Sequence, residues 1–82
     1  VVADVDEARA RAVADAVRAA GGDALAVACD VTDDDAVRAM VAACVGAFGG
    51  LDCAVNAAGV GGVQEATHAY PEAAWLRTLD VN

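Results

Sequence analysis

The amino-acid sequence predicts an α/β fold in which parallel strands alternate with helices. Short apolar runs, which are typical of buried strands, alternate with longer segments whose apolar residues recur at helical spacing. The connections are short, and glycine pairs or acidic residues interrupt the pattern. The resulting order, β-α-β-α-β-α, indicates a parallel sheet with helices on its faces, because parallel neighbours need a helical crossover.

The first half of the chain holds two expected strands and two expected helices. Residues 1–4 are interpreted as the end of a buried strand, and Asp6 can cap a helix over residues 7–20. A continuous apolar run at residues 24–29 is typical of a strand that is covered on both faces. The second helix follows Thr32, which lies three residues before an acid and so resembles the start of a capping box.

Both helices carry an apolar stripe that we expect to form the core. Residues at helical spacing share one face, and that face is buried in most globular proteins. The stripes are Ala10, Val13, Ala14 and Val17 in the first helix and Val37, Met40, Val41, Cys44 and Phe48 in the second.

The second half of the chain contains the third strand and the third helix. Residues 51–56 form the expected strand, and a loop rich in glycine and polar residues follows it. Pro71 suits the first turn of the last helix, which continues to Asn82.

The charge of the chain excludes several classes of partner. Thirteen acids and five bases give a net charge of −8, and all five bases are arginine. An acidic chain repels phosphate backbones, so we expect no nucleic-acid partner. The same charge argues against docking on anionic membranes, and no apolar run is long enough to span a bilayer.

The three cysteines, Cys29, Cys44 and Cys53, are expected to be buried free thiols. Their number is odd and no two of them form a C-x-x-C motif, so we expect neither a disulfide nor a metal site. Free thiols indicate a reducing, cytoplasmic compartment. The chain starts at Val1 without methionine or a basic segment, so no targeting signal is visible and we expect an N-terminal part to be missing.

Polar or small residues follow each expected strand. Asp4 ends the first strand, Asp30 and Val31 end the second, and residues 56–59 end the third. The carboxyl ends of parallel strands meet at one edge of the sheet, which is where open α/β sheets bind ligands. An acid at the position of Asp4 can accept both ribose hydroxyls of an adenosine, and Asp30 can accept from an adenine amine while Val31 packs on the ring.

Each of these residues also has a purely structural interpretation. Asp4 can be a solvated acid before a helix, and Asp30 can terminate a strand before a turn. Residues 56–59 lack large side chains, which allows close approach of a ligand to the backbone but also suits an ordinary turn.

Other candidate residues favour the structural interpretation. Asp33, Asp34 and Asp35 complement a helix dipole better than they form a cation site. His68, the only histidine, is a possible general base but is more typical of a solvated loop. Tyr70 is interpreted as a loop or interface aromatic.

Four motifs, in order and spacing, resemble the short-chain dehydrogenase/reductase family. They are Val-Val-Ala-Asp-Val-Asp at the start, Cys-Asp-Val-Thr-Asp, Leu-Asp-Cys-Ala-Val-Asn-Ala-Ala-Gly, and Trp-Leu-Arg-Thr-Leu-Asp-Val-Asn at the end. Each motif is weak alone, but the ordered set covers the whole chain. Ala57 departs from the family pattern, which usually has a second asparagine there.

The resemblance implies a partial Rossmann-type, doubly wound parallel sheet over residues 1–82. It implies an enzyme that transfers a hydride between NAD, preferred over NADP, and an alcohol or ketone, and that assembles as a homo-dimer or homo-tetramer. Asn82 matches an asparagine of the family's catalytic tetrad. The positions that match the family's cofactor contacts are Asp4, Val5, Asp30, Val31, Asn56, Ala57, Ala58 and Gly59.

The chain lacks several parts that the resemblance requires. No glycine-rich turn lies before Asp4, and the catalytic Tyr-x-x-x-Lys motif cannot be built because the chain has no lysine. We therefore expect the 82 residues alone to be inactive. The resemblance also places the family's first strand between this chain's first and third strands, so residues 51–56 would have no neighbour, and we expect a marginally stable or aggregation-prone chain.

Two other interpretations remain open. The chain can be a truncated, non-catalytic module that at most associates with a partner. A flavodoxin-like signalling domain with an acidic phosphoacceptor is a weaker alternative, because it explains neither Asn-Ala-Ala-Gly nor the last helix.

Overall fold

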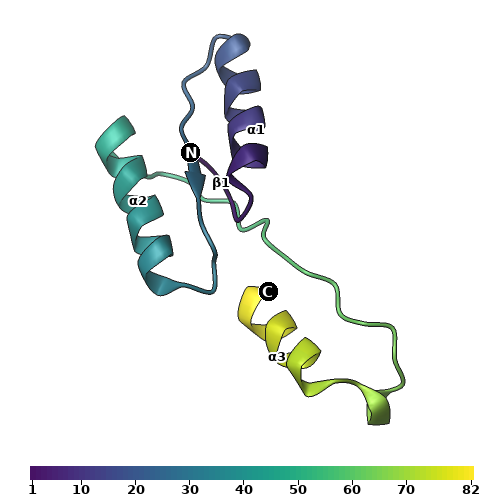
Figure 1. The fold of residues 1–82 in the computed structure, drawn as a ribbon. Helices are drawn as coiled ribbons and strands as arrows, with labels where there is room; N and C mark the ends of the chain where they lie inside the picture. The colour runs from purple at the N-terminus through teal and green to yellow at the C-terminus, as the bar shows by residue number, and fades with distance from the viewer.

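The computed structural model describes all 82 residues of the chain. It is an α/β structure in which the expected alternation is present up to the second helix (Figure 1). In chain order, its elements are β1 (Val2–Asp4), α1 (Glu7–Ala19), β2 (Ala26–Ala28), α2 (Asp34–Phe48), a short 3-10 helix η1 (Thr67–Ala69) and α3 (Glu72–Val81).

The sheet consists of β1 and β2, which pair in parallel as predicted. Val2 lies opposite Ala26 and Asp4 opposite Ala28, so both strands end at the same edge. The ladder extends beyond the strands, because the Val2 amide donates to Leu25 at 2.8 Å and the Cys29 amide donates to Asp4 at 3.0 Å. The sheet contains these two strands and no third.

Helix α1 covers one face of this sheet and begins where the sequence predicts. The Asp6 carboxylate caps it by accepting from the Ala8 amide at 3.0 Å. Gly21, with φ of 90°, allows the chain to reverse after the last turn. Ala10 and Ala14 are buried against the strands, whereas Val13 and Val17, which were also expected in the core, are exposed.

Helix α2 begins one residue later than expected and is poorly covered. Asp33, not Thr32, is the N-cap residue, and its carboxylate accepts from the Asp35 amide at 2.9 Å. Gly49, with φ of 84°, ends the helix. The stripe predicted to be core is only partly covered: Cys44 is buried, Val37 and Met40 are half-buried, and Val41 and Phe48 are exposed.

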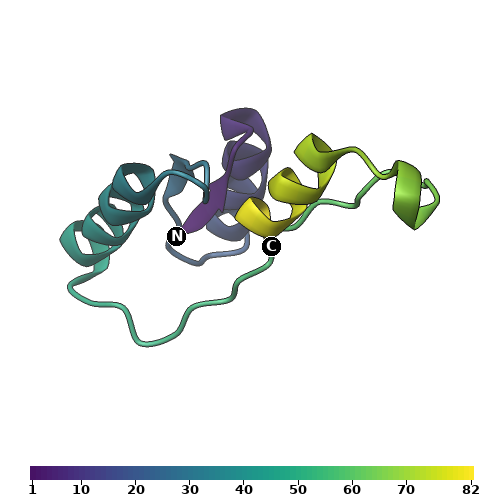
Figure 2. The ribbon, with the colours of Figure 1, turned by 90° about the horizontal axis from the view of Figure 1, so that it is seen from below.

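The predicted third strand is absent. Residues 51–56 run as extended chain that pairs with nothing, and all six are exposed. This segment arches away from β1 and β2 between α2 and the loop (Figure 2). The expected lack of a neighbouring strand is therefore seen, and the expectation that Cys53 is buried is wrong, although all three cysteines are free.

The loop before α3 is held by one aromatic residue. The Tyr70 hydroxyl accepts from the Val63 amide at 3.2 Å, and its ring makes an edge-on contact with Trp75 at a centroid distance of 6.4 Å. A side chain at Gly62 would collide with that hydroxyl, so the close approach requires glycine there.

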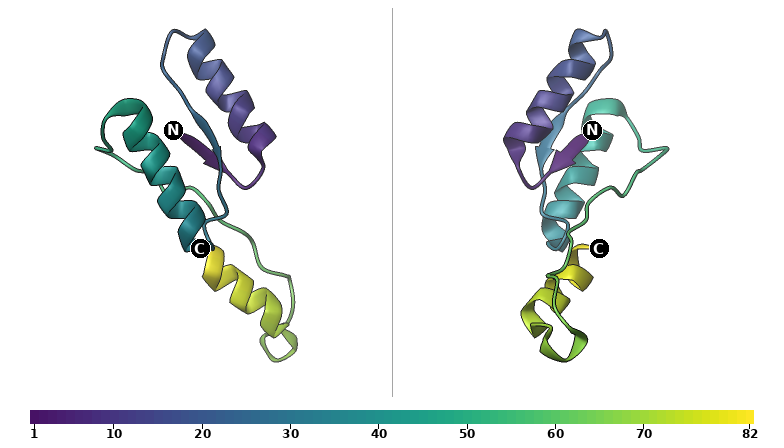
Figure 3. Two further views of the ribbon diagram at one scale, coloured as in Figure 1. Left: turned by 60° about the vertical axis from the view of Figure 1, so that its left-hand side comes forward. Right: turned by 90° about the vertical axis from the view of Figure 1, so that its right-hand side faces the viewer.

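Helix α3 stands apart from the sheet and the other helices, with its C-terminal end pointing back toward the centre of the molecule (Figure 3). It begins at Glu72, after Pro71, close to the predicted start. None of the helices is both long and apolar enough to cross a membrane.

Candidate functional site

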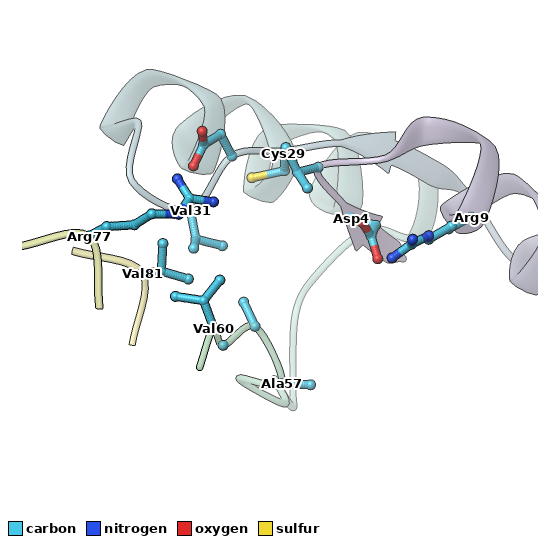
Figure 4. A pocket seen from close by; sticks show the side chains of 12 residues that line it. Asp4, Arg9, Cys29, Val31, Ala57, Val60, Arg77 and Val81 are labelled. Carbon is cyan, nitrogen blue, oxygen red and sulfur yellow. The ribbon is translucent and has the colours of Figure 1, made fainter. Parts of the chain in front are cut away.

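A cavity of about 350 Å³ lies at the carboxyl ends of β1 and β2. Four parts of the chain form it: the strand ends, the first turn of α1, the loop after residue 56, and α3 (Figure 4). Seven of the eight residues predicted to contact a cofactor line it, namely Asp4, Val5, Asp30, Val31, Ala57, Ala58 and Gly59. The structure thus brings together residues that are more than fifty positions apart in the sequence.

Asp4 is half-buried at the end of β1 and is held in place by a local bond. Its Oδ1 accepts from the Asp6 amide at 2.8 Å, which fixes the carboxylate at the strand end. Its second oxygen remains able to accept hydrogen bonds from a ligand in the cavity. A carboxylate at this place can accept from a pair of neighbouring hydroxyls.

The Asp30 carboxylate is held by hydrogen bonds from Thr32, two residues later in the chain. Its Oδ1 accepts from the Thr32 amide at 3.0 Å and from the Thr32 hydroxyl at 2.8 Å. These bonds lower the pKa of the Asp30 carboxyl below its usual value; desolvation opposes them, and the positive charge of Arg77 adds the least of the lowering effects. Asp30 is therefore a negatively charged acceptor at neutral pH.

The third wall of the cavity is backbone with small side chains. Ala57, Ala58 and Gly59 line it, so a ligand can approach the main chain closely. Asn56 is not part of this wall. It lines a separate, largely apolar cavity of about 320 Å³ together with residues of β1 and α2.

Asn82, the predicted catalytic residue, forms two hydrogen bonds with the backbone of the loop that follows residue 56. Its Oδ1 accepts from the Val60 amide at 2.8 Å, and its Nδ2 donates to the Val60 carbonyl at 3.1 Å. The side chain thus joins the end of α3 to the residue that follows Gly59. In this structure it fixes the third wall of the cavity.

Five lining residues were not predicted from the sequence: Arg9, Cys29, Val60, Arg77 and Val81. Arg77 and Val81 lie four residues apart on α3, so they share a face, and Val81 precedes the predicted Asn82. That spacing was a usable signal. No signal in the sequence marked Arg9, because only the packing of α1 against β1 brings its side chain to the cavity beside Asp4.

The cavity has the size and chemistry for one nucleoside. Its volume of about 350 Å³ lies near the lower end of the roughly 300–1,000 Å³ typical of small-molecule sites. Carboxylates at two strand ends offer acceptors for hydroxyl and amine groups, and Val31 and Val81 offer apolar surface for a ring. The residues present therefore fit the adenosine half of a dinucleotide.

Comparison with known proteins gives the same fold and family. The family model described as enoyl-(acyl carrier protein) reductase matches residues 1–82. A 2,5-dichloro-2,5-cyclohexadiene-1,4-diol dehydrogenase of Sphingobium indicum is 46% identical over 68 residues, which cover 79% of this chain and 27% of that protein. A cis-4-hydroxycyclohexanecarboxylate dehydrogenase of Sinomonas cyclohexanicum is 40% identical over 82 residues, which are 100% of this chain and 32% of that protein.

A solved structure agrees over almost the whole chain. It is the crystal structure of a metagenomic short-chain oxidoreductase in complex with NADP, which matches with a TM-score of 0.85 and 35% identity. The match covers 96% of this chain and 36% of the solved one. The chain thus spans about a third of the length of its relatives, and over that length it belongs to the short-chain dehydrogenase/reductase family.

Proposed function

We propose that this chain forms the adenosine-binding part of an oxidoreductase that transfers a hydride between NAD and an alcohol or ketone. The observation that carries the proposal is the cavity at the ends of β1 and β2, which gathers seven of the eight expected contact residues. Relatives named as dehydrogenases of cyclic alcohols support the reaction class. The NADP held by the solved neighbour supports a nicotinamide dinucleotide.

NAD is proposed as the preferred cofactor because of Asp4. A carboxylate that accepts from both ribose hydroxyls favours the unphosphorylated ribose and repels a 2′-phosphate. Asp30 would accept from the adenine amine, and Val31 would pack on the ring. Asn56 does not line the cavity but directly precedes Ala57, Ala58 and Gly59, which do. Its contribution to cofactor binding is therefore proposed to be indirect, through the position of these residues.

The nicotinamide, when bound, supplies the hydride chemistry, and this chain supplies binding and orientation. Asp4 and Asp30 would fix the adenosine, while residues 57–60 would close over it. Asn82 would hold that wall in position and, as in the family tetrad, keep a water in the proton relay. The tyrosine and lysine that would move the proton in this family have no counterpart here, so the 82 residues alone are proposed to be inactive.

We further propose a cytoplasmic enzyme that assembles as a homo-oligomer, for which the free thiols and the exposed apolar face of α3 offer support. A second candidate is a non-catalytic module of the same ancestry. The exposed segment 51–56 favours it, because such a chain needs a partner to complete its sheet.

Calorimetry with NAD tests the proposal on this chain and on the product of the complete reading frame. NAD binding and oxidation of simple secondary alcohols by the latter would support it, and Asp4→Ala should then weaken NAD binding by about tenfold or more. Absence of NAD binding by both proteins would refute the nucleotide site and leave the non-catalytic module.

A further inference from the structure

Tyr70 is one of two covered residues in an otherwise exposed stretch of chain. Between residues 51 and 70, only Val60 and Tyr70 are half-buried, and every other residue is exposed. Val60 lines the cavity at the ends of β1 and β2 and is bonded to Asn82. Tyr70 does not line that cavity, so its burial has a different cause.

The Tyr70 side chain packs against the backbone of the loop that precedes it. Its hydroxyl accepts from the Val63 amide at 3.2 Å, and a Cβ at Gly62 would overlap the hydroxyl oxygen. The ring is held in turn by Trp75, which it meets edge-on with centroids 6.4 Å apart. The hydroxyl therefore holds the loop at Gly62 and Val63 through the main chain.

The segment from Val60 to Val63 is thus bonded at both ends to residues that flank α3. Asn82 follows the C-terminal end of this helix, and Tyr70 lies two residues before its start at Glu72. The segment therefore runs antiparallel to the helix, as the loop beside α3 does in Figure 1. A ten-residue helix rises about 15 Å and three extended residues reach about 10 Å, so the two side chains bridge the difference.

Two glycines, Gly61 and Gly62, are the only residues between the bonded ends of this segment. Glycine loses more conformational freedom on ordering than any other residue. Because both ends are bonded, this freedom is lost before a ligand arrives. A wall that is already ordered in the free protein lowers the entropic cost of binding. With the Asn82 bonds alone, the chain that leaves Val60 would be ordered only when the ligand binds.

We propose that Tyr70 is a positioning residue for cofactor binding. Its hydroxyl preorganises the segment from Val60 to Val63 and with it the end of the cavity wall. This inference rests on the proposed function and gives a role at the cofactor site to a residue that does not touch the cofactor. Removal of the hydroxyl should therefore weaken cofactor binding.

The test compares dissociation constants of NAD, measured by calorimetry on the product of the complete reading frame. Tyr70→Phe removes the hydroxyl but keeps the ring against Trp75, and it should weaken NAD about fivefold, which corresponds to one net hydrogen bond. Thr78→Val is the matched control and should leave NAD within about twofold. Its hydroxyl also lies close to Gly62 but donates to the Ala74 carbonyl of its own helix at 2.8 Å.

Gly62→Ala gives an independent check, because the added methyl overlaps the Tyr70 hydroxyl. It should weaken NAD about tenfold or more when the hydroxyl is present. In the Tyr70→Phe background the nearest ring atom lies 3.2 Å from that methyl, so the further loss should stay within about twofold. Gly61→Ala is the control, because its Cβ would meet open space, and it should not change NAD binding.

Two results would overturn the inference while leaving the NAD site in place. One is a Tyr70→Phe protein that binds NAD as tightly as the unmodified protein, with only a lower Tm, which is the pattern of a purely structural role. The other is a Gly62→Ala substitution that weakens NAD equally with and without the Tyr70 hydroxyl. Absence of NAD binding by the unmodified protein would instead refute the proposed function, and this inference with it.

Discussion

Asn82 connects two parts of the chain that no other element holds together. Its paired bonds to Val60 span 22 residues and hold one end of the backbone wall of the cavity. This amide side chain therefore determines whether Val60 keeps its position relative to the C-terminal end of α3. The residue is not buried, so the bonds contribute modestly to stability but strongly to the order of the loop.

Asn82→Ala should remove both hydrogen bonds to Val60 and so increase the mobility of residues 57–60. Two net hydrogen bonds are worth about 1–2 kcal/mol, so the Val60 amide should exchange its proton about five- to thirtyfold faster with solvent. Hydrogen exchange followed by NMR measures the change. Asn56→Ala, which removes the same amide from an exposed position, is the control and should leave the exchange of Val60 unchanged.

Asp30 introduces a pH dependence at the second strand end. Bonds from the Thr32 amide and hydroxyl hold the pKa of the folded Asp30 carboxyl below its usual value, with help from Arg77. Its contribution to stability is therefore complete above the unfolded pKa and is lost as the pH falls through the folded pKa. An acid titration followed by circular dichroism should show a shallower loss of structure below pH 5 for Asp30→Asn.

The same titration needs a control for charge alone. Asp52→Asn removes one negative charge from the exposed segment 51–56 and should keep the acid-dependent loss of the unmodified chain. An identical shallowing in both variants would show that net charge, rather than the bonds to Thr32, causes the dependence.

At the scale of elements, the ends of α2 are determined by local residues. Asp33 caps its start and Gly49 adopts φ of 84° at its end. Gly49→Ala should cost about 1 kcal/mol, because an L-residue is strained in the left-handed region. Gly46→Ala, inside the same helix with open space around it, should instead gain up to about 1 kcal/mol. Helical ellipticity of the two variants should thus change in opposite directions.

The sequence predicted the local elements well and the long-range ones less well. Helical spacing, caps and glycines located α1, α2 and α3 to within one or two residues, because these signals act over a single turn. The strand at residues 51–56 was predicted from its apolar composition, but a strand exists only when a neighbour pairs with it. Exposure of Val41, Phe48 and Cys53 has the same cause, since burial depends on what packs opposite.

In the candidate site, too, local positions were predictable from the sequence and long-range packing was not. Asp4, Asp30 and residues 57–59 were predictable because parallel strands end at one edge and the family motifs mark those ends. Arg9 and Arg77 were not, because their side chains reach the cavity from helices whose docking no short motif encodes.

At the scale of the whole molecule, the chain buries too little to be stable by itself. Four of 82 residues are buried, and none is larger than cysteine. Its radius of gyration is 15.7 Å, whereas a compact chain of this length has about 12 Å. Apolar burial of this extent does not offset the conformational entropy of ordering the backbone.

We therefore expect the isolated chain to melt broadly, without a cooperative transition. Thermal circular dichroism of dilute monomer measures this, and X-ray scattering in solution checks whether the radius stays above the compact value. A sharp transition well above room temperature would contradict the expectation. Addition of the flanking reading frame should restore cooperativity if the sheet is completed there.

The bonds between Asn82 and Val60 close a ring in the chain. The backbone wall of the cavity lies at the point where this ring closes, whereas residues 61–70 form its far side. Lengthening a closed loop costs little, about 0.6 kcal/mol for each doubling of its length. Segments of different length and sequence can therefore be grafted between Val63 and Tyr70 while the point of closure and the contacts of the Tyr70 hydroxyl stay fixed. Because of this ring, that stretch can change in length and sequence without displacing the backbone wall of the cavity.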